Sequence, residues 1–233
     1  MTTRRSFLAG TALFAAHAAM AKTQQSCAVF TKTTQSDITF DQALARLKDG
    51  NARFLKGQTI HCDPRIEVRD TANGQAPFAA ILGCMDSRVA PELVFDQRIG
   101  DLFVVRVAGN FVNVDILGSL EYATQVVGAK LIVVLGHTEC GAVKGAIDDV
   151  KLGNLTATLA NIRPAVLEIS DAGGERTSKN KSFVQSVADR NAKDAAGMLT
   201  SRSEVMASLV KEGKLEIVSA MHDVTTGKVR WLA

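Results

Sequence analysis

Two short clusters of potential metal ligands stand out in this sequence. Cys84 and Asp86 belong to the first, and His137 and Cys140 belong to the second. Thiolate and imidazole groups are the ligands that zinc prefers, and three protein ligands leave a fourth tetrahedral position for water, substrate or a carboxylate. Taken singly, each cysteine could be a core residue or a disulfide partner. Together, the clusters favour one Zn²⁺ ion per subunit, held by Cys84, His137 and Cys140.

The spacing within each cluster predicts how its side chains reach a single ion. Cys84 and Asp86 are two residues apart, and side chains at this spacing point the same way in extended chain. His137 and Cys140 are three residues apart. If a helix begins at His137, residues at this spacing share one of its faces.

Each cluster follows an apolar run that is typical of a strand buried on both faces. Such runs cover residues 77–83, 101–107 and 130–136. Helical patterns cover residues 89–95 and 115–127, and another follows Cys140. The alternation predicts an α/β fold with a mainly parallel central β-sheet flanked by helices. Because functional groups gather at the carboxyl ends of parallel strands, we expect both clusters at one edge.

The rest of the sequence predicts further elements of one domain covering residues 37–233. Hydrophobic residues recur at helical spacing over residues 41–54. Residues 183–212 form a second helical region, which we expect to be interrupted near Gly197. Residues 215–220 and 229–232 resemble a closing pair of short strands.

The N-terminus has the pattern of an export signal. Arg4 and Arg5 precede Ser, Phe and Leu and then an apolar stretch too short to span a membrane, which indicates a twin-arginine signal peptide over residues 1–21. We expect cleavage after Ala21; cleavage after Ala18 and an uncleaved amphipathic leader are the alternatives. Residues 22–36 are polar and predict a flexible arm. The expected location is the periplasm, without a stable membrane anchor.

Charge and the two other cysteines add smaller expectations. Without residues 1–21 the 27 basic groups lose two arginines, which leaves 25 against 24 acidic groups and gives no electrostatic case for nucleic acid. Cys27 and Cys62 lie outside the zinc pattern and could form a disulfide in an oxidising compartment, which the sequence leaves open. His61 and Asp63 are interpreted as loop residues, and His222 as a packed histidine.

The motif C-x-D-x-R at residues 84–88, followed by H-x-x-C at residues 137–140, resembles the β-carbonic anhydrases. Residues 100–106, Gly-Asp-Leu-Phe-Val-Val-Arg, strengthen the resemblance, which extends over nearly the whole mature chain. It implies a β-carbonic anhydrase-like fold and reversible hydration of carbon dioxide to bicarbonate and a proton, through attack by zinc-bound hydroxide. It also implies a homodimer or homotetramer with the active site near the subunit boundary.

The resemblance also assigns roles around the metal. Asp86 would orient the attacking group by accepting its proton in a hydrogen bond, and Arg88 would hold that carboxylate. In some family members the equivalent aspartate becomes the fourth zinc ligand in a closed state. The plant-type pocket residues correspond by position to Gln75, Phe103 and Tyr122. The two aromatic residues could instead be ordinary core residues, and Gln75 could simply be exposed.

Two alternatives remain at this point. The same scaffold could hydrolyse carbonyl sulfide or carbon disulfide, which are similar linear electrophiles. The chain could instead be a non-catalytic structural or sensor protein in which Asp86 is a permanent fourth ligand. The presence of Arg88 beside Asp86 favours an enzyme, because a purely structural site has no need of the arginine.

Overall fold

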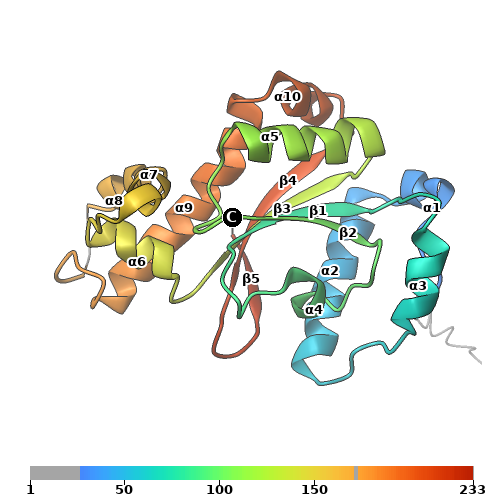
Figure 1. Cartoon of the computed structure of the whole chain (residues 1–233), viewed down its shortest axis with the longest axis horizontal. Helices are drawn as coiled ribbons and strands as arrows, with labels where there is room; N and C mark the ends of the chain where they lie inside the picture. Colours follow the sequence, from blue (N-terminus) through green and yellow to red (C-terminus); the bar gives the residue numbers. More distant parts are fainter. Residues whose placement is uncertain (1–26, 171–172, 233) are drawn as a thin grey trace, which may run out of the picture.

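A five-stranded sheet forms the centre of the protein (Figure 1). The computed structural model describes residues 27–170 and 173–232. The strand order is β2-β1-β3-β4-β5, in which β5 is antiparallel to β4 and the other neighbours are parallel. The strands are β1 (Ala79–Gly83), β2 (Leu102–Arg106), β3 (Leu131–His137), β4 (Glu216–His222) and β5 (Val229–Leu232). The predicted α/β class and the closing pair of strands are confirmed.

Helices cover both faces of this sheet. In Figure 1, α2 and α4 lie on one side of the strands, and α5, α9 and α10 lie on the other. The helices are α1 (Lys32–Asp37), α2 (Phe40–Leu55), α3 (Pro64–Thr71), α4 (Pro91–Val94), α5 (Val114–Glu121), the π-helical turn η1 (Tyr122–Val127), α6 (Gly141–Ile147), α7 (Gly153–Ala160), α8 (Arg163–Glu168), α9 (Lys181–Ser201) and α10 (Glu204–Lys211).

The continuous apolar sequence of β3 follows from these two covering layers. Alternate side chains of a strand point to opposite faces. Leu131, Val133 and Leu135 pack in the cluster that contains Leu47 of α2. Ile132 and Val134 pack in the other cluster, which includes the buried face of α9. A strand with helices on both faces has no solvent side, so no polar residue interrupts it.

The register of the strands brings the two ligand clusters to the same edge. Gly83, the last residue of β1, pairs with Leu135 of β3. Cys84 therefore leaves the sheet about level with the carboxyl end of β3, where His137 lies. The expectation that both clusters lie at one edge is confirmed.

Helix α2 extends one residue beyond each end of its prediction. The Thr39 hydroxyl accepts a hydrogen bond from the backbone N–H of Gln42, and the Gln42 side chain accepts one from Thr39, which completes a capping box. Gly50 lies directly against α4, because a Cβ at this position would be 1.7 Å from the carbonyl oxygen of Phe95. Only glycine allows this approach.

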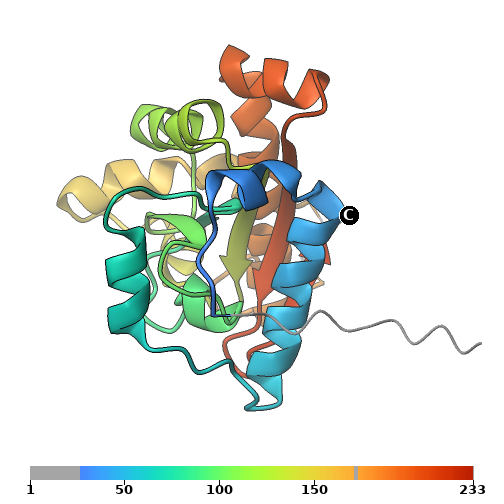
Figure 2. The same ribbon diagram turned by 90° about the vertical axis from the view of Figure 1, so that its right-hand side faces the viewer.

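The prediction of a flexible arm over residues 22–36 is wrong for the part that the structure describes. Residues 27–31 run between α3 and α2 in Figure 2, and α1 follows with a capping box at Thr31. Gln35 is buried and donates a hydrogen bond to the carbonyl oxygen of Pro77 over 2.6 Å. The rest of the arm and the signal peptide predicted at residues 1–21 lie outside the described residues.

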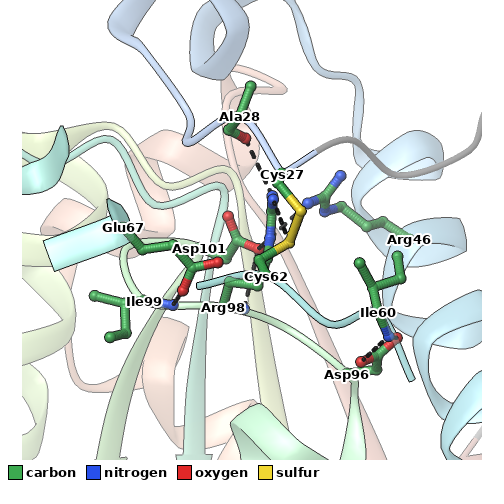
Figure 3. The surroundings of a disulfide bond; sticks show 10 residues. All are labelled: Cys27, Ala28, Arg46, Ile60, Cys62, Glu67, Asp96, Arg98, Ile99 and Asp101. Carbon is green, nitrogen blue, oxygen red and sulfur yellow. Dashed lines mark hydrogen bonds and ion pairs between the residues drawn. A yellow bond between two sulfur atoms is a disulfide. The ribbon is translucent and has the colours of Figure 1, made fainter. Parts of the chain in front are cut away.

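A disulfide between Cys27 and Cys62 fastens this segment (Figure 3). Arg98 lies beside it and donates a hydrogen bond to the carbonyl oxygen of Ala28 over 3.2 Å. The guanidinium of Arg98 also contacts the carboxylate of Asp101, which is fully buried just before β2. The pairing that the sequence left open is therefore present, and it ties the N-terminal segment to the main body of the protein.

The C-terminal helical region differs from its prediction in one detail. Gly197 lies inside α9, which continues to Ser201. The break comes at Arg202 and Ser203, where the Ser203 hydroxyl accepts a hydrogen bond from the backbone of Met206 and caps α10. Over residues 27–170 and 173–232, no helix has both the length and the apolar character needed to cross a membrane.

Candidate metal centre

Cys84, His137 and Cys140 form a compact group of metal-ligand atoms at the carboxyl edge of the sheet. The two sulfurs and a ring nitrogen all lie within 4.8 Å of one another. The sulfurs are 4.0 Å apart, and all three residues are at most 4% exposed. The structure thus brings Cys84 together with His137 and Cys140, which lie more than fifty residues further along the chain.

His137 and Cys140 converge through a turn, not through the helical face that their spacing suggested. The helix α6 begins only at Gly141, and Cys140 is its N-cap residue. Glu139 makes the turn with a φ of +58°, a conformation that non-glycine residues rarely adopt. A backbone outlier at a ligand site indicates that the surrounding structure imposes it.

The hydrogen bonds of His137 leave one ring nitrogen for a metal. Its Nδ1 is 2.9 Å from the carbonyl oxygen of Thr138, which can only accept, so Nδ1 carries the proton. Its Nε2 is buried and has no hydrogen-bond partner among the described residues. A buried, unpartnered imidazole nitrogen whose opposite nitrogen is fixed by a carbonyl is the arrangement of a zinc-ligating histidine.

The pKa values of the two cysteine thiols are coupled through the contact between their sulfurs. The pKa of Cys84 is lowered to about 4, first by its hydrogen bond with Cys140 and then by His137 and the backbone N–H of Gly109, whose nitrogen is 3.3 Å from the sulfur. The pKa of Cys140 is raised by its hydrogen bond with Cys84 and by burial. One proton is thus shared between the two sulfurs, and a divalent cation is needed for both to be ionised together.

These donors fit zinc. Tetrahedral coordination with zinc–sulfur bonds of about 2.3 Å places two sulfurs about 3.8 Å apart, close to the 4.0 Å between Cys84 and Cys140. His137 supplies the third donor. Two soft thiolates and one imidazole are also the chemistry that selects zinc over magnesium or calcium.

Asp86 and Arg88 lie beside this group as a closely matched ion pair. Arg88 donates from Nε to Oδ1 over 2.9 Å, from Nη2 to Oδ2 over 2.7 Å and from its backbone to Oδ1 over 3.0 Å. These bonds hold the pKa of the Asp86 carboxyl well below its ordinary range, with Arg88 as the largest cause. Oδ2 of Asp86 is 3.9 Å from Nε2 of His137, so the carboxylate faces the metal position while Arg88 holds it.

The three residues of the predicted substrate pocket do not lie beside the metal ligands of this chain. Phe103 is level with Ala80, four residues before Cys84, which is about 13 Å along a strand. Gln75 is exposed and precedes β1 at the opposite edge of the sheet. Phe103 and Tyr122 do contact each other, edge to face, with ring centroids 6.2 Å apart.

Three further residues support the centre without having been assigned a role from the sequence. Gly109 donates its N–H to the Cys84 sulfur, and its carbonyl oxygen accepts a hydrogen bond from the buried side chain of Asn191 over 2.8 Å. Arg106 donates two hydrogen bonds to the chain between Cys84 and Asp86. Gly109 and Arg106 lie at the carboxyl end of β2, so their position at the predicted edge was a usable signal.

The fold and the centre together define the class: an α/β protein that holds one zinc ion with two cysteines and one histidine, beside a carboxylate held by arginine. A family model described as carbonic anhydrase matches residues 79–229. Carbonic anhydrase 2 of Mycobacterium tuberculosis is 37% identical over 188 residues, covering 78% of this chain and 87% of that protein. The carbonic anhydrase of Mycolicibacterium smegmatis is 38% identical over 189 residues, covering 78% and 88%.

Solved structures agree with the sequence relatives. The β-carbonic anhydrase CafA of Aspergillus fumigatus superposes with a TM-score of 0.65 at 27% identity, covering 83% of this chain and 90% of that one. A tetrameric β-carbonic anhydrase of Sordaria macrospora gives a TM-score of 0.63 at 25% identity, covering 83% and 96%. The chain belongs to the β-carbonic anhydrase family. It is a zinc enzyme that catalyses the reversible hydration of carbon dioxide.

Proposed function

We propose that this chain is an exported carbonic anhydrase in which Asp86 and Arg88 orient the reacting water and a second subunit completes the substrate pocket. The observation that carries the catalytic part is the position of Asp86. Its carboxylate faces Nε2 of His137 at 3.9 Å, while three N–H groups of Arg88 hold it. A carboxylate held in this way leaves the fourth metal position to a water molecule.

The chemistry of the side chains assigns a separate role to the metal ligands and to Asp86. Cys84, His137 and Cys140 hold the metal. When bound, zinc supplies a Lewis acid that makes a water molecule acidic enough to deliver hydroxide near neutral pH. Asp86 stays ionised because Arg88 lowers its pKa, so it can only accept hydrogen bonds. By accepting a hydrogen bond from the reacting group, it directs an oxygen lone pair of that group toward the carbon of carbon dioxide.

Replacing Asp86 by asparagine tests this role. The Asp86→Asn variant keeps the size of the side chain and loses the anionic acceptor, so we expect kcat/KM to fall about 10- to 100-fold with zinc content unchanged. Asp63 provides a matched control, because it holds Arg65 through the same three hydrogen bonds at the surface. Asp63→Asn should be as active as the wild type.

Two results would contradict the proposal. Full activity of Asp86→Asn with full zinc would remove Asp86 from the mechanism. A wild-type enzyme that turns over carbonyl sulfide or carbon disulfide in preference to carbon dioxide, assayed side by side, would change the substrate. X-ray absorption of the zinc site across pH reports whether water or the Asp86 carboxylate is the fourth ligand.

The second subunit is proposed from where the pocket residues lie. Phe103 and Tyr122 line an open groove of about 800 Å³ along β2, which is the edge strand of the sheet. Tyr122 is 49% exposed and Val114 is 74% exposed, so apolar side chains are exposed in this groove, beside the free edge of β2. We propose that Gln75, Phe103 and Tyr122 serve the metal centre of a partner subunit in a homodimer or homotetramer.

Dilution tests the assembly. We expect sedimentation to show at least a dimer, and specific activity to fall in step with dissociation on dilution. Tyr122→Ala should weaken the dimer, whereas Leu167→Ala, which alters another exposed apolar residue, on α8, should not. Full activity in a demonstrated monomer would refute a shared pocket.

Export to the periplasm is proposed from the N-terminal sequence and the disulfide. Arg4 and Arg5 precede an apolar stretch of signal-peptide length. The disulfide between Cys27 and Cys62 supports an oxidising compartment, because cytosolic thiols are kept reduced. We expect N-terminal sequencing of the mature enzyme to begin at Lys22. Equal export of a reporter fusion after both arginines are changed to lysine would rule out the twin-arginine route.

A further inference from the structure

The guanidinium of Arg106 donates hydrogen bonds to the backbone of the segment that contains Cys84 and Asp86. It is the last residue of β2 and is opposite Gly83. Its Nε donates to the carbonyl oxygen of Cys84 over 2.9 Å, and its Nη2 donates to the carbonyl oxygen of Asp86 over 2.6 Å. Among the described residues, no carboxylate forms an ion pair with it.

The other hydrogen bonds of Asp86 are local. Arg88, which holds the carboxylate, is only two residues away, and the carbonyl oxygen also accepts a bond from the backbone N–H of Val89. These bonds fix the shape of the turn but not its position relative to the sheet. Within the part of the chain that the structure describes, one other hydrogen bond joins the pair to a distant residue: it runs from Arg88 to the carbonyl oxygen of Glu139 and is 3.4 Å long.

Cys84 is held at the edge of the sheet by both its backbone and its sulfur. Its backbone directly follows β1, and its sulfur accepts a hydrogen bond from Gly109. Asp86 lies two residues further from the sheet, where the backbone is neither strand nor helix. The bond from Arg106 to the Asp86 carbonyl is therefore the short link that fixes the distance between the carboxylate and the metal ligands.

We propose that Arg106 is a positioning residue for the hydration reaction: its planar fork holds the Cys84–Asp86 backbone against β2 and so sets the Asp86 carboxylate at its working distance from the metal centre. This inference rests on the catalytic role proposed above for Asp86. A guanidinium fits two carbonyl oxygens at fixed spacing, whereas an ammonium group is a point donor. The geometry of the fork, and not only its charge, is therefore required.

The experiment compares Arg106→Ala and Arg106→Lys with the wild-type zinc enzyme, and uses Arg65→Ala as the control for loss of a surface arginine. We expect Arg106→Ala to lower kcat/KM about 10- to 100-fold, because a displacement of about 1 Å near reacting groups has effects of this size. Zinc content should stay at one ion per subunit, since the metal ligands keep their own supports. Arg106→Lys should recover only part of the loss, and Arg65→Ala should match the wild type.

Two readouts separate positioning from general destabilisation. Because the Arg106 side chain is exposed, millimolar guanidinium should restore activity to Arg106→Ala and leave Asp86→Asn unchanged. The double variant Asp86→Asn/Arg106→Ala should be no less active than Asp86→Asn alone, because the two residues act through one carboxylate.

Several results would overturn the role of Arg106 or that of Asp86. Wild-type activity in Arg106→Ala, full recovery in Arg106→Lys, or zinc loss in proportion to activity would overturn the inference. If Arg106→Ala does not fold, Arg106→Lys decides, and undiminished kcat/KM in that variant would overturn it. Loss of activity in Asp86→Asn with no effect at Arg106 would reject this inference and leave the proposed function intact. Full activity in Asp86→Asn would reject the role of Asp86 itself.

Discussion

Removing the disulfide between Cys27 and Cys62 should destabilise the protein without affecting its chemistry. The bond lies near Asp101, which precedes β2 (Figure 3). The metal ligands lie at the carboxyl ends of β1 and β3. The perturbation is the double variant Cys27→Ser/Cys62→Ser, which keeps the side chains close in size. Its zinc content and its kcat/KM should equal those of the wild type.

The size of the effect follows from the length of chain that the bond closes. The two cysteines are 35 residues apart, and loop closure of this length removes about 13 cal/mol/K from the unfolded chain, or about 4 kcal/mol at 25 °C. The native contacts that the bond holds in place add to this value. Phe30, three residues beyond Cys27, packs against Phe78 with ring centroids 5.2 Å apart. For a chain of this size about 4 kcal/mol corresponds to a fall in Tm of roughly 8–15 °C.

Urea unfolding of the two proteins at one protein concentration and one zinc concentration measures the difference. The wild type in a phosphine reductant should unfold like the double variant, and the double variant should not respond to the reductant. Fixed concentrations matter because zinc and subunit association both stabilise the native state by mass action. A difference below about 1 kcal/mol would refute the entropic reasoning, and a loss of activity would show that the N-terminal segment acts on the site.

Three further outcomes follow from the contacts of the centre. Cys140→Ser should lose zinc and all activity, as measured by metal analysis of the purified protein. Gly109→Ala should destabilise the fold by about 1–3 kcal/mol, because φ is +80° and the new Cβ would be 2.3 Å from Cδ1 of Ile162. Burial lowers the pKa of His222 from its ordinary 6.5, so the unfolded chain takes up a proton first and stability falls as pH drops below about 6.5. His222→Gln should flatten that part of the urea-measured pH profile relative to the wild type.

The metal ligands were predictable because two independent signals agree: the spacing of the ligand residue types within each cluster, and the buried strand that each cluster follows. Buried strands can be recognised from continuous apolar sequence, and parallel pairing then places the residues that follow them at one edge. The turn between His137 and Cys140 was not predictable. Its geometry depends on a left-handed Glu139, and nothing in a glutamate marks that conformation in advance.

The N-terminal segment shows why composition misleads for residues that become anchored by tertiary contacts. Polar residues over 27–36 resemble a solvated arm, but Gln35 is buried against the backbone of Pro77 and Cys27 is tied to Cys62. Neither partner is close in sequence, so no local pattern reports the contact. By contrast, the start of α3 carried a readable signal, because Asp63 followed by proline is a good N-cap and first helical residue.

Two of the three Asp-x-Arg sequences of this chain, at Asp63 and Asp86, separate what a motif encodes from what the fold adds; in the third, Asp96 forms an ion pair with Arg53. Asp63 and Arg65 form the same three hydrogen bonds as Asp86 and Arg88, with lengths that differ by no more than 0.2 Å. The local unit thus forms wherever the chain turns in this way, and at Asp63 it lies at the surface and caps a helix. Asp86 differs because β1 delivers it to the metal edge and Arg106 ties its backbone to β2. The catalytic role proposed for Asp86 and Arg88 therefore depends on these two supports, and the sequence motif has predictive value only when a buried strand precedes it.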